Sequence, residues 1–595
     1  MILIPQTKVD EYTAKGWWGT ATLWDLFVHH QQTTPHAEAV VDAPNRADFA
    51  HGSPQRLTWS QLGDEVDSLC LALLNAGLKR DDIMVLQMPN GIEQFVVYLA
   101  FARLGIVATP EPVQYREHEL GHILEQTQAV AAITFTRIGK PEAGHATAAM
   151  YAELKARHAA LKTVLAWGDA PDGTSATGSS GLRGGADVRL YDCDGYAAQR
   201  ITALDRNHVA QAAAQAAVTA NDVFTICWTS GTEAQPKGVP RSHNEWLIIA
   251  PSIAEAAELQ AGARLLNPFP LVNMAGLSTA FATWLMLGAT VVQHQPFSLP
   301  VFLQQLRDEK IDYTVAPPAV LNMLLQNEAL LAGIDFKRLW RIGSGSAPLS
   351  EWMVRGFEDR YGVQIVNYFG SNEGAALTGN RSDIPDPGLR AQFYPRAGVE
   401  GFSWSISTTR KIQTRLVDLD TGDDIARPGK AGEIRFAGPT IFSGYYAAPE
   451  LSARAFDAQG FYKTGDLFEI AGDSNQFYRY IGRSKDLVIR GGVNISSEEI
   501  ENLLLACPGV HEAAVVGVFD ATLGEKVCAC VVVTEGQTVT LQSVTAYLRE
   551  EKKIAVYKLP EYLLTLAVLP RNPVGKILKR ELREQAKTLI EGSTA

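Results

Sequence analysis

Thr229–Gly238 reads T-S-G-T-E-A-Q-P-K-G, and the organisation of the whole chain can be worked out from this stretch. It follows Val223–Trp228, a run of β-branched and aromatic residues that predicts a buried strand. Small residues allow a backbone to close around an anion, hydroxyl and amide groups donate to its oxygens, and a lysine adds positive charge. We therefore predict a loop that binds phosphate.

The spacing differs from the Walker pattern, because the proline and the lysine both precede the last glycine of the stretch. This difference argues against an ordinary P-loop fold. A turn rich in Gly, Ser and Thr is, taken alone, more often a plain solvent loop. The phosphate interpretation therefore depends on motifs elsewhere in the chain.

The composition is that of a globular protein, with 46% hydrophobic and 20% charged residues. A chain of 595 residues is too long for one compact core, so we expect roughly two to four domains or subdomains. The net charge of -12 is the opposite of the basic excess that nucleic-acid-binding proteins carry. We expect no nucleic-acid partner.

Met1–Asp10 lacks the features of a signal peptide, and no run of about 18 apolar residues follows it. We therefore expect a cytoplasmic protein without a membrane span. Six cysteines in so long a chain do not suggest a disulfide framework. Cys528 and Cys530 lie in an alternating apolar strand with no second Cys/His pair at ligand spacing, which favours core packing over a metal site.

Helices and short apolar strands alternate from about Thr22 to Ala216, which predicts α/β layers around parallel sheet. Leu57–Leu78 has the helical rhythm, Ile83–Met88 reads as a strand, and His243–Leu259 predicts a further helix. Gly432–Tyr446 reads as strands and tight turns.

Val510–Lys576 has a β-α-β rhythm that is typical of a small compact domain. Pro171–Ala186 is rich in Gly and Ser, and we expect a mobile surface loop there without a chemical role.

Motifs along the chain resemble, in order, those of the adenylate-forming superfamily of acyl- and aryl-CoA synthetases, peptide-synthetase adenylation domains and luciferases. Thr229–Gly238 resembles its T-S-G-T-T-G-x-P-K-G signature, with Glu233 and Ala234 in place of Thr and Gly. The resemblance implies a mixed α/β fold. A large N-terminal domain, residues 1–484, would combine layered α/β subdomains with a β-rich subdomain. Residues 485–595 would form a small mobile α+β lid with its hinge at Lys485.

Five further motifs carry the resemblance. They are Arg341–Leu349, which contains a segment similar to G-G-A-P-L; Asn367–Gly374, similar to Y-G-x-T-E; Tyr462–Leu467, which matches Y-x-T-G-D; Gly482–Asp486, similar to G-R-x-K-D; and Pro570–Lys576, which matches P-x-x-x-x-G-K. Asn372 replaces the usual threonine of the second of these motifs, but its amide can still donate to a phosphate oxygen.

The resemblance assigns most of these residues to ATP. Phe369 would stack on the adenine, and Asp466 and Arg483 would bind the ribose. The residues expected to contact ATP are Thr229, Ser230, Gly231, Thr232, Lys237, Gly345, Ser346, Ala347, Pro348, Asn367, Tyr368, Phe369, Gly370, Asn372, Asp466, Arg483 and Lys576.

The resemblance also implies the catalytic groups. Lys576 would bridge the carboxylate and the α-phosphate, and Glu373 with Thr232 would hold Mg²⁺. Lys576, Glu373 and Thr229 are the expected catalytic residues.

The acid pocket is expected at Asn273, Met274, Gly276, Ser371 and Ala375. These side chains are small or apolar and include no cation, which favours a hydrophobic fatty, alicyclic, aromatic or steroid-like carboxylate over an amino acid. Asn273 has a second possible role as the cap of a helix that begins near Ala275.

The expected reaction has two steps: a carboxylate attacks the α-phosphate of ATP to give an acyl-adenylate and pyrophosphate, and the thiol of CoA then displaces AMP. Gly491, Gly492 and Val493 would leave room for the pantetheine arm. The enzyme would act as a monomer or homodimer. Two alternatives stay open: a stand-alone adenylating enzyme that loads a separate carrier protein, and an inactive nucleotide-binding relative.

Overall fold

The computed structural model describes residues 1–168, 182–183, 188–191, 201–229, 236–490, 493–520, 523–552, 554, 556–572 and 575–593. Side chains are not described at 182–183, 188–191, 485, 493–494, 589 and 591–593. Several predicted residues lie outside the described set: Ser230, Gly231, Thr232, Glu233, Ala234, Gly491 and Gly492, with the side chains of Lys485 and Val493. The predicted loop Pro171–Ala186 lies there too, apart from the backbone of residues 182–183.

The first large sheet contains the strand that leads into Thr229, and its order is β10-β9-β4-β3-β5-β6-β8-β7. Its strands are β3 (Ile83–Gln87), β4 (Val107–Pro110), β5 (Ala131–Phe135), β6 (Thr163–Trp167), β7 (Leu182–Arg183), β8 (Val188–Tyr191), β9 (Val223–Thr229) and β10 (Lys237–Ser242). The strands from β9 to β8 pair in parallel. All five residues of β3 are buried, as expected for a parallel strand covered on both faces.

The second large sheet has the order β16-β15-β14-β13-β11-β12-β1-β2. Its strands are β1 (Glu38–Val41), β2 (Arg56–Thr58), β11 (Arg264–Asn267), β12 (Thr290–Gln293), β13 (Tyr313–Val315), β14 (Arg341–Gly345), β15 (Gln364–Gly370) and β16 (Ala376–Gly379). The central strands from β1 to β15 are parallel, and the two edge strands are antiparallel to their neighbours. The mixed α/β fold expected from the sequence is confirmed.

Helices occur between the strands throughout residues 6–455. They are α1 (Gln6–Ala14), α2 (Leu23–Thr33), α3 (Trp59–Asn75), α4 (Ile92–Leu104), α5 (Glu117–Thr127), α6 (Thr147–Arg157), α7 (Ala203–Ala216), α8 (His243–Leu247), α9 (Ala250–Ala256), α10 (Met274–Gly276), the π-helix η3 (Leu277–Ala282), α11 (Thr283–Leu287), α12 (Leu299–Asp308), α13 (Pro318–Gln326), α14 (Glu351–Tyr361), α15 (Pro387–Gln392) and α16 (Pro449–Ala455). None of the helices in the described part of the chain is long and apolar enough to cross a membrane.

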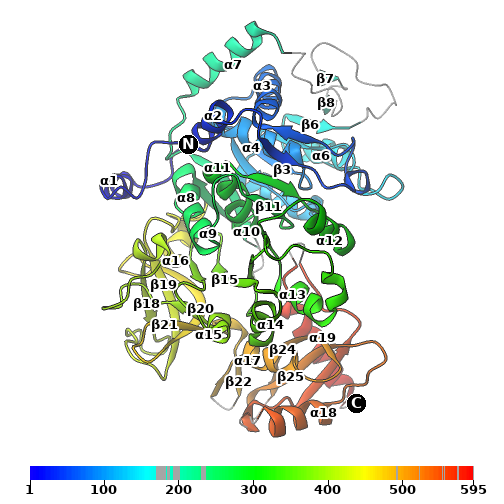
Figure 1. The fold of residues 1–595 in the computed structure, drawn as a ribbon, viewed down its shortest axis with the longest axis vertical. Coiled ribbons are helices and arrows are strands. Elements are labelled where there is room, and N and C mark those ends of the chain that lie inside the picture. Colours follow the sequence, from blue (N-terminus) through cyan, green and yellow to red (C-terminus); the bar gives the residue numbers. More distant parts are fainter. Residues whose placement is uncertain are drawn as a thin grey trace.

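One shared core joins the two large sheets. A single buried cluster includes Met84 of β3, Phe95 of α4, Trp284 of α11 and Tyr313 of β13. The indole ring of Trp284 stacks on Trp59 at a centroid distance of 4.8 Å. Residues of both sheets and of the helices α4 and α11 therefore share one core, and these elements lie in the upper half of Figure 1.

The predicted helix at Leu57–Leu78 is observed as α3, which begins after Thr58 with a capping box formed with Gln61. The single helix predicted over His243–Leu259 is wrong in its continuity, because the chain forms α8 and then α9 there. Pro251 stands at the start of α9 and has no N–H for a preceding turn, which explains why a new helix begins at that point.

The third sheet is antiparallel and forms the predicted β-rich subdomain. Its order is β17-β21-β20-β19-β18, with β17 (Phe393–Pro395), β18 (Gln413–Val417), β19 (Ala431–Ala437), β20 (Tyr462–Ala471) and β21 (Phe477–Arg483). A short 3-10 turn, η6 (Ser484–Asp486), follows β21 and leads to the last module.

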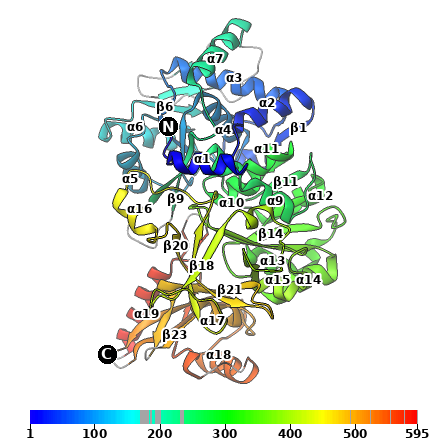
Figure 2. The ribbon, with the colours of Figure 1, turned by 90° about the vertical axis from the view of Figure 1, so that its left-hand side faces the viewer.

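The C-terminal module is built on a fourth sheet, β23-β22-β25-β24 with β26 beside β25. Its elements are β22 (Val488–Arg490), β23 (Val493–Ile495), α17 (Ser497–Leu504), β24 (Val510–Asp520), β25 (Gly524–Val533), α18 (Leu541–Ala546), β26 (Tyr562–Leu566) and α19 (Lys579–Ser593). It lies at the lower end of the molecule in both Figure 1 and Figure 2.

Successive residues of β24 face opposite sides of this sheet. Val515 belongs to a cluster with Ile500 of α17, and Val516 belongs to another with Leu582 of α19. Cys528 and Cys530 are fully buried in the second cluster, as the packing interpretation predicted. The five described cysteines are all free and buried.

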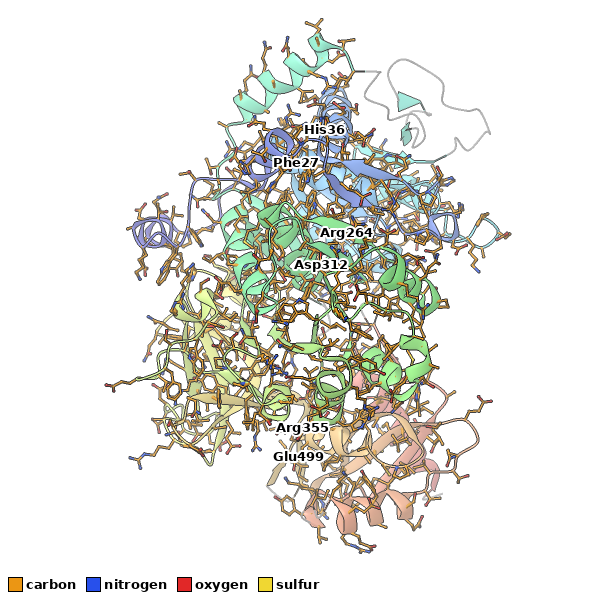
Figure 3. The ribbon with its side chains drawn as sticks, in the orientation of Figure 1. Phe27, His36, Arg264, Asp312, Arg355 and Glu499 are labelled. Atoms are coloured by element: carbon orange, nitrogen blue, oxygen red, sulfur yellow. The ribbon has the colours of Figure 1, made fainter. Side chains whose placement is uncertain are left out.

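Ion pairs hold the amino-terminal ends of the strands in the second sheet. The Arg264 backbone N–H at the start of β11 donates to Asp312 Oδ2 over 2.7 Å; Figure 3 labels both residues. The Arg264 guanidinium pairs with Glu309 at 2.8 Å. These charged side chains are paired with each other or with the backbone at this end of the sheet. The loops of the predicted motifs begin at the opposite, carboxyl-terminal ends of the strands, and the candidate site lies there.

Candidate active site

Three segments that are distant in the sequence meet beside Asn372. The Asn372 side chain donates from Nδ2 to the carbonyl oxygen of Trp228 over 3.1 Å, and its Oδ1 accepts from the Met274 N–H over 2.8 Å. Trp228 lies near the end of β9, and Met274 begins α10. The amide that we expected to contact phosphate thus ties together the phosphate-loop strand and the acid-loop helix.

The two ends of the phosphate loop lie side by side. Thr229 pairs with Lys237 at the open end of the antiparallel β9–β10 ladder. The Lys237 Nζ lies 5.4 Å from the ring centroid of Tyr445, a distance at which a cation is attracted to an aromatic face. Lys237 is therefore held at the mouth of the loop.

Glu373, the carboxylate predicted to hold Mg²⁺, is buried, with 7% of its surface exposed. Its Oε1 accepts from the Tyr445 hydroxyl over 3.0 Å, and its carbonyl oxygen accepts from the Phe442 N–H over 2.9 Å. Arg241, which is fully buried, donates to the Asn372 carbonyl over 3.1 Å. These bonds fix the turn that carries the carboxylate.

The donor chemistry at Glu373 suits Mg²⁺. Nucleotide-bound Mg²⁺ is usually held through one or two carboxylates together with phosphate oxygens, rather than by an all-protein cage. Within the described ranges no group of three or more His, Cys, Asp or Glu side chains could hold a metal ion. A single buried carboxylate positioned by Tyr445 fits the first arrangement.

The segment predicted to lie along adenine begins where β14 ends. Gly345 pairs with Tyr368, and a side chain at this position would overlap the Tyr368 carbonyl oxygen, so the close approach needs glycine. Ser346 has a φ of 68°, and both Ser346 and Ala347 are exposed. Phe369 packs edge-to-face on Phe468 at 5.1 Å.

The side chain of Asn367 is hydrogen-bonded to neighbouring parts of the fold. Its Nδ2 donates to the carbonyl oxygens of Arg390 and Ala391 over 3.0 and 3.1 Å, and its Oδ1 accepts from the Tyr394 hydroxyl over 2.8 Å. This side chain therefore ties β15 to α15 and to β17, and its predicted contact with ATP stays a prediction. Gly370 is exposed at the end of β15.

The two predicted ribose residues are brought together. Asp466 and Arg483 face each other in the β20–β21 ladder, and Arg483 Nε donates to Asp466 Oδ1 over 2.9 Å. Asp466 is 3% exposed. Burial alone lowers the pKa of Arg483, but the adjacent carboxylate raises it above its ordinary value, so the guanidinium stays charged.

Glu498 of α17 is a site residue that sequence reasoning missed. It accepts from the Tyr480 hydroxyl over 3.2 Å, and burial together with the charges of Glu501 and Asp466 raises its pKa to about 7, although Lys579 opposes the shift. Acidic residues in a first helical turn normally read only as helix-terminus charges. No local signal could have shown that this one contacts the β-rich subdomain.

Lys576 lies on an exposed hairpin of the C-terminal module. Asn572 and Lys576 close the hairpin with two bonds of 2.8 Å, and Gly575 between them has a φ of 86°. Its predicted approach to the α-phosphate stays a prediction, as does the pivot at Lys485.

The predicted acid-pocket residues lie in different surroundings. Asn273 Oδ1 accepts from the Ala275 and Gly276 N–H groups over 3.1 and 3.4 Å, so the capping role is observed. Met274 is buried in the core shared by the large sheets, whereas Ala375 is buried in the β-rich subdomain. The Ser371 hydroxyl is buried and has no hydrogen-bond partner among the described residues.

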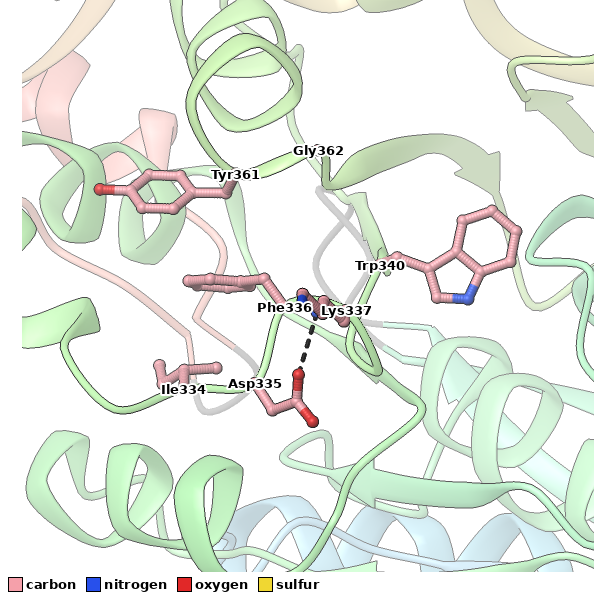
Figure 4. Close-up of a pocket in the computed structure, with 7 residues that line it drawn as sticks. All are labelled: Ile334, Asp335, Phe336, Lys337, Trp340, Tyr361 and Gly362. Atoms are coloured by element: carbon pink, nitrogen blue, oxygen red, sulfur yellow. Dashed lines mark hydrogen bonds between the residues drawn. The ribbon is translucent and has the colours of Figure 1, made fainter.

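A separate hollow of about 770 Å³ lies near the amino-terminal ends of β14 and β15 in the second sheet (Figure 4). Its lining residues are Ile334, Asp335, Phe336, Lys337, Trp340, Tyr361 and Gly362. Trp340 directly precedes β14, so the hollow faces the amino-terminal ends of the strands. It contains none of the predicted site residues.

Two family models match the chain. The family model described as AMP-binding enzyme matches residues 27–446, and the model of the AMP-binding enzyme C-terminal domain matches residues 499–576. A salicylyl-CoA synthase / salicylate adenylyltransferase from Streptomyces sp is 31% identical over 98% of this chain and 96% of that protein.

Two further similarities differ in what they show. A medium-chain fatty-acid–CoA ligase from Escherichia coli (strain K12) is 29% identical over 96% of this chain and 92% of that protein. The crystal structure of an anthranilate CoA ligase in complex with anthranoyl-AMP has a TM-score of 0.75 at 19% identity and covers 96% of this chain and 98% of that one. The second similarity shows the fold alone.

Proposed function

The chain belongs to the AMP-binding enzyme family and is an adenylate-forming ligase, and we propose that it is an AMP-forming carboxylate–CoA ligase. In the first step a carboxylate oxygen bonds to the α-phosphorus of ATP and pyrophosphate leaves. In the second step the sulfur of CoA bonds to the carbonyl carbon, AMP leaves, and the thiol proton goes to solvent or base.

The observation that carries this proposal is the meeting of three motifs at Asn372. The phosphate-loop strand and the acid loop are bonded to one side chain, so a phosphate and a carboxylate held by these loops would lie close together. Neither step requires a covalent enzyme nucleophile, and positioning with charge stabilisation accounts for the chemistry.

Charge is supplied from both sides of the bond that forms. Lys237 at the loop mouth would neutralise the phosphates, and Lys576 of the C-terminal module would neutralise charge between carboxylate and α-phosphate. Mg²⁺, when bound at Glu373, supplies Lewis-acid stabilisation of the leaving pyrophosphate. Asp466 would accept hydrogen bonds from the ribose hydroxyls.

The acid is proposed to be hydrophobic and acyl or aryl. Related proteins are named for salicylate and for medium-chain fatty acids, and Met274 belongs to an apolar core cluster. No basic side chain stands among the five predicted pocket residues.

A carrier protein is the second candidate acceptor. One relative is named both as a CoA synthase and as an adenylyltransferase, so relatives of this kind do not separate the two acceptors. Incubation with ATP, the acid and CoA alone, followed by mass spectrometry, should yield the CoA thioester. Thioester found only on an added phosphopantetheinyl carrier protein would favour the second candidate.

The first experiment is a pyrophosphate-release assay with a panel of fatty, alicyclic, aromatic and steroid-like acids. We expect release that depends on one class of acid and on Mg²⁺. An enzyme that binds ATP but releases no pyrophosphate with any acid would instead support an inactive nucleotide-binding relative.

A further inference from the structure

A chain of buried hydrogen bonds leads from the first large sheet to the start of the predicted phosphate loop. The Trp228 indole Nε1 donates to Thr109 Oγ1 over 2.6 Å, and Thr109 Oγ1 donates to Glu111 Oε1 over 3.0 Å. Trp228 is the last residue but one of β9, and Thr109 lies in the neighbouring strand β4. The chain of bonds therefore ends one residue before Thr229.

Glu111 is an unusual group at the far end of this chain. It is fully buried, and its Oε2 has no hydrogen-bond partner among the described residues. Burial raises the pKa of this carboxyl well above its usual range, although the Thr109 bond opposes the shift, so the carboxyl keeps its proton. A buried polar group with an unsatisfied atom destabilises the fold, and an apolar side chain would not. The bond to Thr109 is the contact that gives the carboxyl a role.

The Trp228 ring contacts the segment that leaves the loop as well as the strand that enters it. Trp228 pairs with Gly238 in the β9–β10 ladder, and a Cβ at Gly238 would lie 3.3 Å from the indole ring. The His122 ring of α5 packs edge-to-face on the indole with the centroids 6.1 Å apart, and His122 Nε2 lies 3.4 Å from the Pro236 carbonyl oxygen. That oxygen can only accept, so Nε2 donates. Indole and imidazole together touch both ends of the loop.

The hydrogen bond to Thr109 fixes how the indole is turned. The torsion between Cβ and an aromatic ring has broad minima, so packing alone leaves such a ring some freedom. The Nε1 bond removes that freedom, while Asn372 holds the Trp228 carbonyl oxygen. Thr229 and Lys237 pair with each other directly beyond the ring and are thereby held at one spacing.

We propose that Glu111 and Thr109 are positioning residues for ATP: through the Trp228 indole they hold Thr229 and Lys237 at the spacing that the phosphates of ATP require. This inference rests on the proposed function. Glu111 takes the only proton of the Thr109 hydroxyl, so that a lone pair of Thr109 always faces the indole N–H.

The proposal predicts an effect on the phosphates that AMP lacks. AMP shares with ATP the adenine, the ribose and the α-phosphate, which are assigned to other residues. The leaving pyrophosphate is assigned to the loop whose ends are Thr229 and Lys237. A change in the spacing of these ends should therefore weaken the binding of Mg·ATP more than the binding of AMP, whereas a general loss of stability would weaken both equally.

The test measures the Kd of Mg·ATP and the Kd of AMP by isothermal titration calorimetry on the full chain and its variants. Thr109→Val removes the hydroxyl and keeps the shape, and Trp228→Phe removes the indole N–H. Each should raise the Kd of Mg·ATP by about 10-fold and that of AMP by less than about 2-fold. In pyrophosphate exchange the KM for ATP should rise by a similar factor, while the KM for the acid changes by less than about 2-fold.

Variants of the carboxyl show whether Glu111 acts through Thr109. Glu111→Gln keeps an oxygen acceptor and Thr109→Ser keeps the hydroxyl, so both should stay within about 2-fold of the wild type. Glu111→Leu should raise the Kd of Mg·ATP by about 3- to 10-fold. Because the two residues act in series, Glu111→Leu combined with Thr109→Val should bind Mg·ATP no more weakly than Thr109→Val alone.

Thr134→Val is the matched control. Thr134 is fully buried in β5 of the same sheet, where β4 and β3 separate it from β9, and its hydroxyl donates to the Gln87 carbonyl over 2.8 Å. This variant loses one buried hydrogen bond and should keep the wild-type ratio of the two Kd values. A ratio that stays unchanged in Thr109→Val and Trp228→Phe, or that changes equally in Thr134→Val, would overturn the inference.

The outcomes separate this inference from the proposed function. A wild type that binds Mg·ATP but releases no pyrophosphate with any acid contradicts the proposed function, and the Kd ratios still decide the inference. A wild type that binds neither nucleotide contradicts both. Thermal unfolding identifies variants that do not fold, and any folded variant among Thr109→Val, Trp228→Phe and Glu111→Leu decides the question.

Discussion

At the scale of single residues, Tyr445 is the side chain that positions Glu373. Its hydroxyl donates to the carboxylate over 3.0 Å. Groups that orient a metal ligand typically contribute 10- to 100-fold to metal affinity or activity. Tyr445→Phe should therefore raise the Mg²⁺ concentration required for half-maximal pyrophosphate exchange by about 10-fold or more, with little change in thermal stability.

Tyr446→Phe is the control for that variant, because the hydroxyl bonded to Glu373 is that of Tyr445, and no bond from the Tyr446 hydroxyl to Glu373 is found among the described residues. An unchanged Mg²⁺ dependence in Tyr445→Phe, measured by titration at saturating ATP, would show that Glu373 does not hold the metal or does not need this bond.

Gly374 tests the turn itself. It has a φ of 95°, and a side chain there would overlap the Thr440 carbonyl oxygen. Gly374→Ala should lower the free energy of unfolding by roughly 2–5 kcal/mol, from backbone strain and overlap together. Gly362→Ala shares the strain, with a φ of 69°, but meets nothing within 4 Å and should cost only about 1 kcal/mol.

Denaturant unfolding of both variants measures the difference. Equal losses would mean that the turn after Glu373 can shift without cost, and that Arg241 does not hold it firmly.

At the scale of elements, α17 makes a contact whose strength depends on pH. Glu498 has a pKa of about 7 in the folded protein, against an ordinary value of 4.5, chiefly because of burial. The folded state therefore holds the proton more tightly than the unfolded state. Between about pH 4.5 and pH 7 stability should fall as pH rises, by an amount on the order of 3 kcal/mol, and the loss should be complete above about pH 7.

Glu498→Gln should remove this dependence, since an amide of the same shape can still bond to Tyr480 and does not ionise. The measurement is the free energy of unfolding from pH 5 to pH 8, taken as the difference between variant and wild type. Glu535→Gln, on the same module but with an exposed carboxyl, is the control. A difference that stays constant with pH would contradict the assignment.

Elements were predicted best where short-range chemistry decides them. Thr58 and Gln61 form the capping box that starts α3, and β3 is apolar along its whole length. The continuous helix over His243–Leu259 was wrong, because the apolar rhythm continues past Pro251 while the hydrogen-bond ladder does not. A helix boundary that depends on one missing backbone N–H does not interrupt the periodic pattern of apolar residues, so the pattern does not reveal it.

At the scale of the whole molecule, the C-terminal module touches the β-rich subdomain through α17 and β21. Ser496 Oγ donates to the Ile481 carbonyl, and the Tyr480 hydroxyl donates to Glu498 over 3.2 Å. These contacts join short segments, and we propose that the module turns about the segment near Lys485 between the two half-reactions.

Turning of the module predicts opposite effects of two substitutions. Lys576→Ala should lower carboxylate-dependent pyrophosphate exchange by at least about 100-fold, while thioester formation from a supplied acyl-adenylate stays near the wild-type rate. Gly492→Trp should show the reverse. Lys587→Ala, an exposed lysine of α19, is the control. Equal loss of both steps in folded Lys576→Ala protein would count against alternation of the module.

The sequence by itself determined the family motifs, the α/β layering and the residues expected to handle ATP, because strands, caps and glycine-rich turns depend on neighbours along the chain. Only the tertiary structure decided that Asn372 bonds to both Trp228 and Met274, that Asn367 supports the fold, and that Glu498 meets Tyr480. These contacts join segments far apart in the sequence. They follow from strand register and helix packing, which no local pattern specifies.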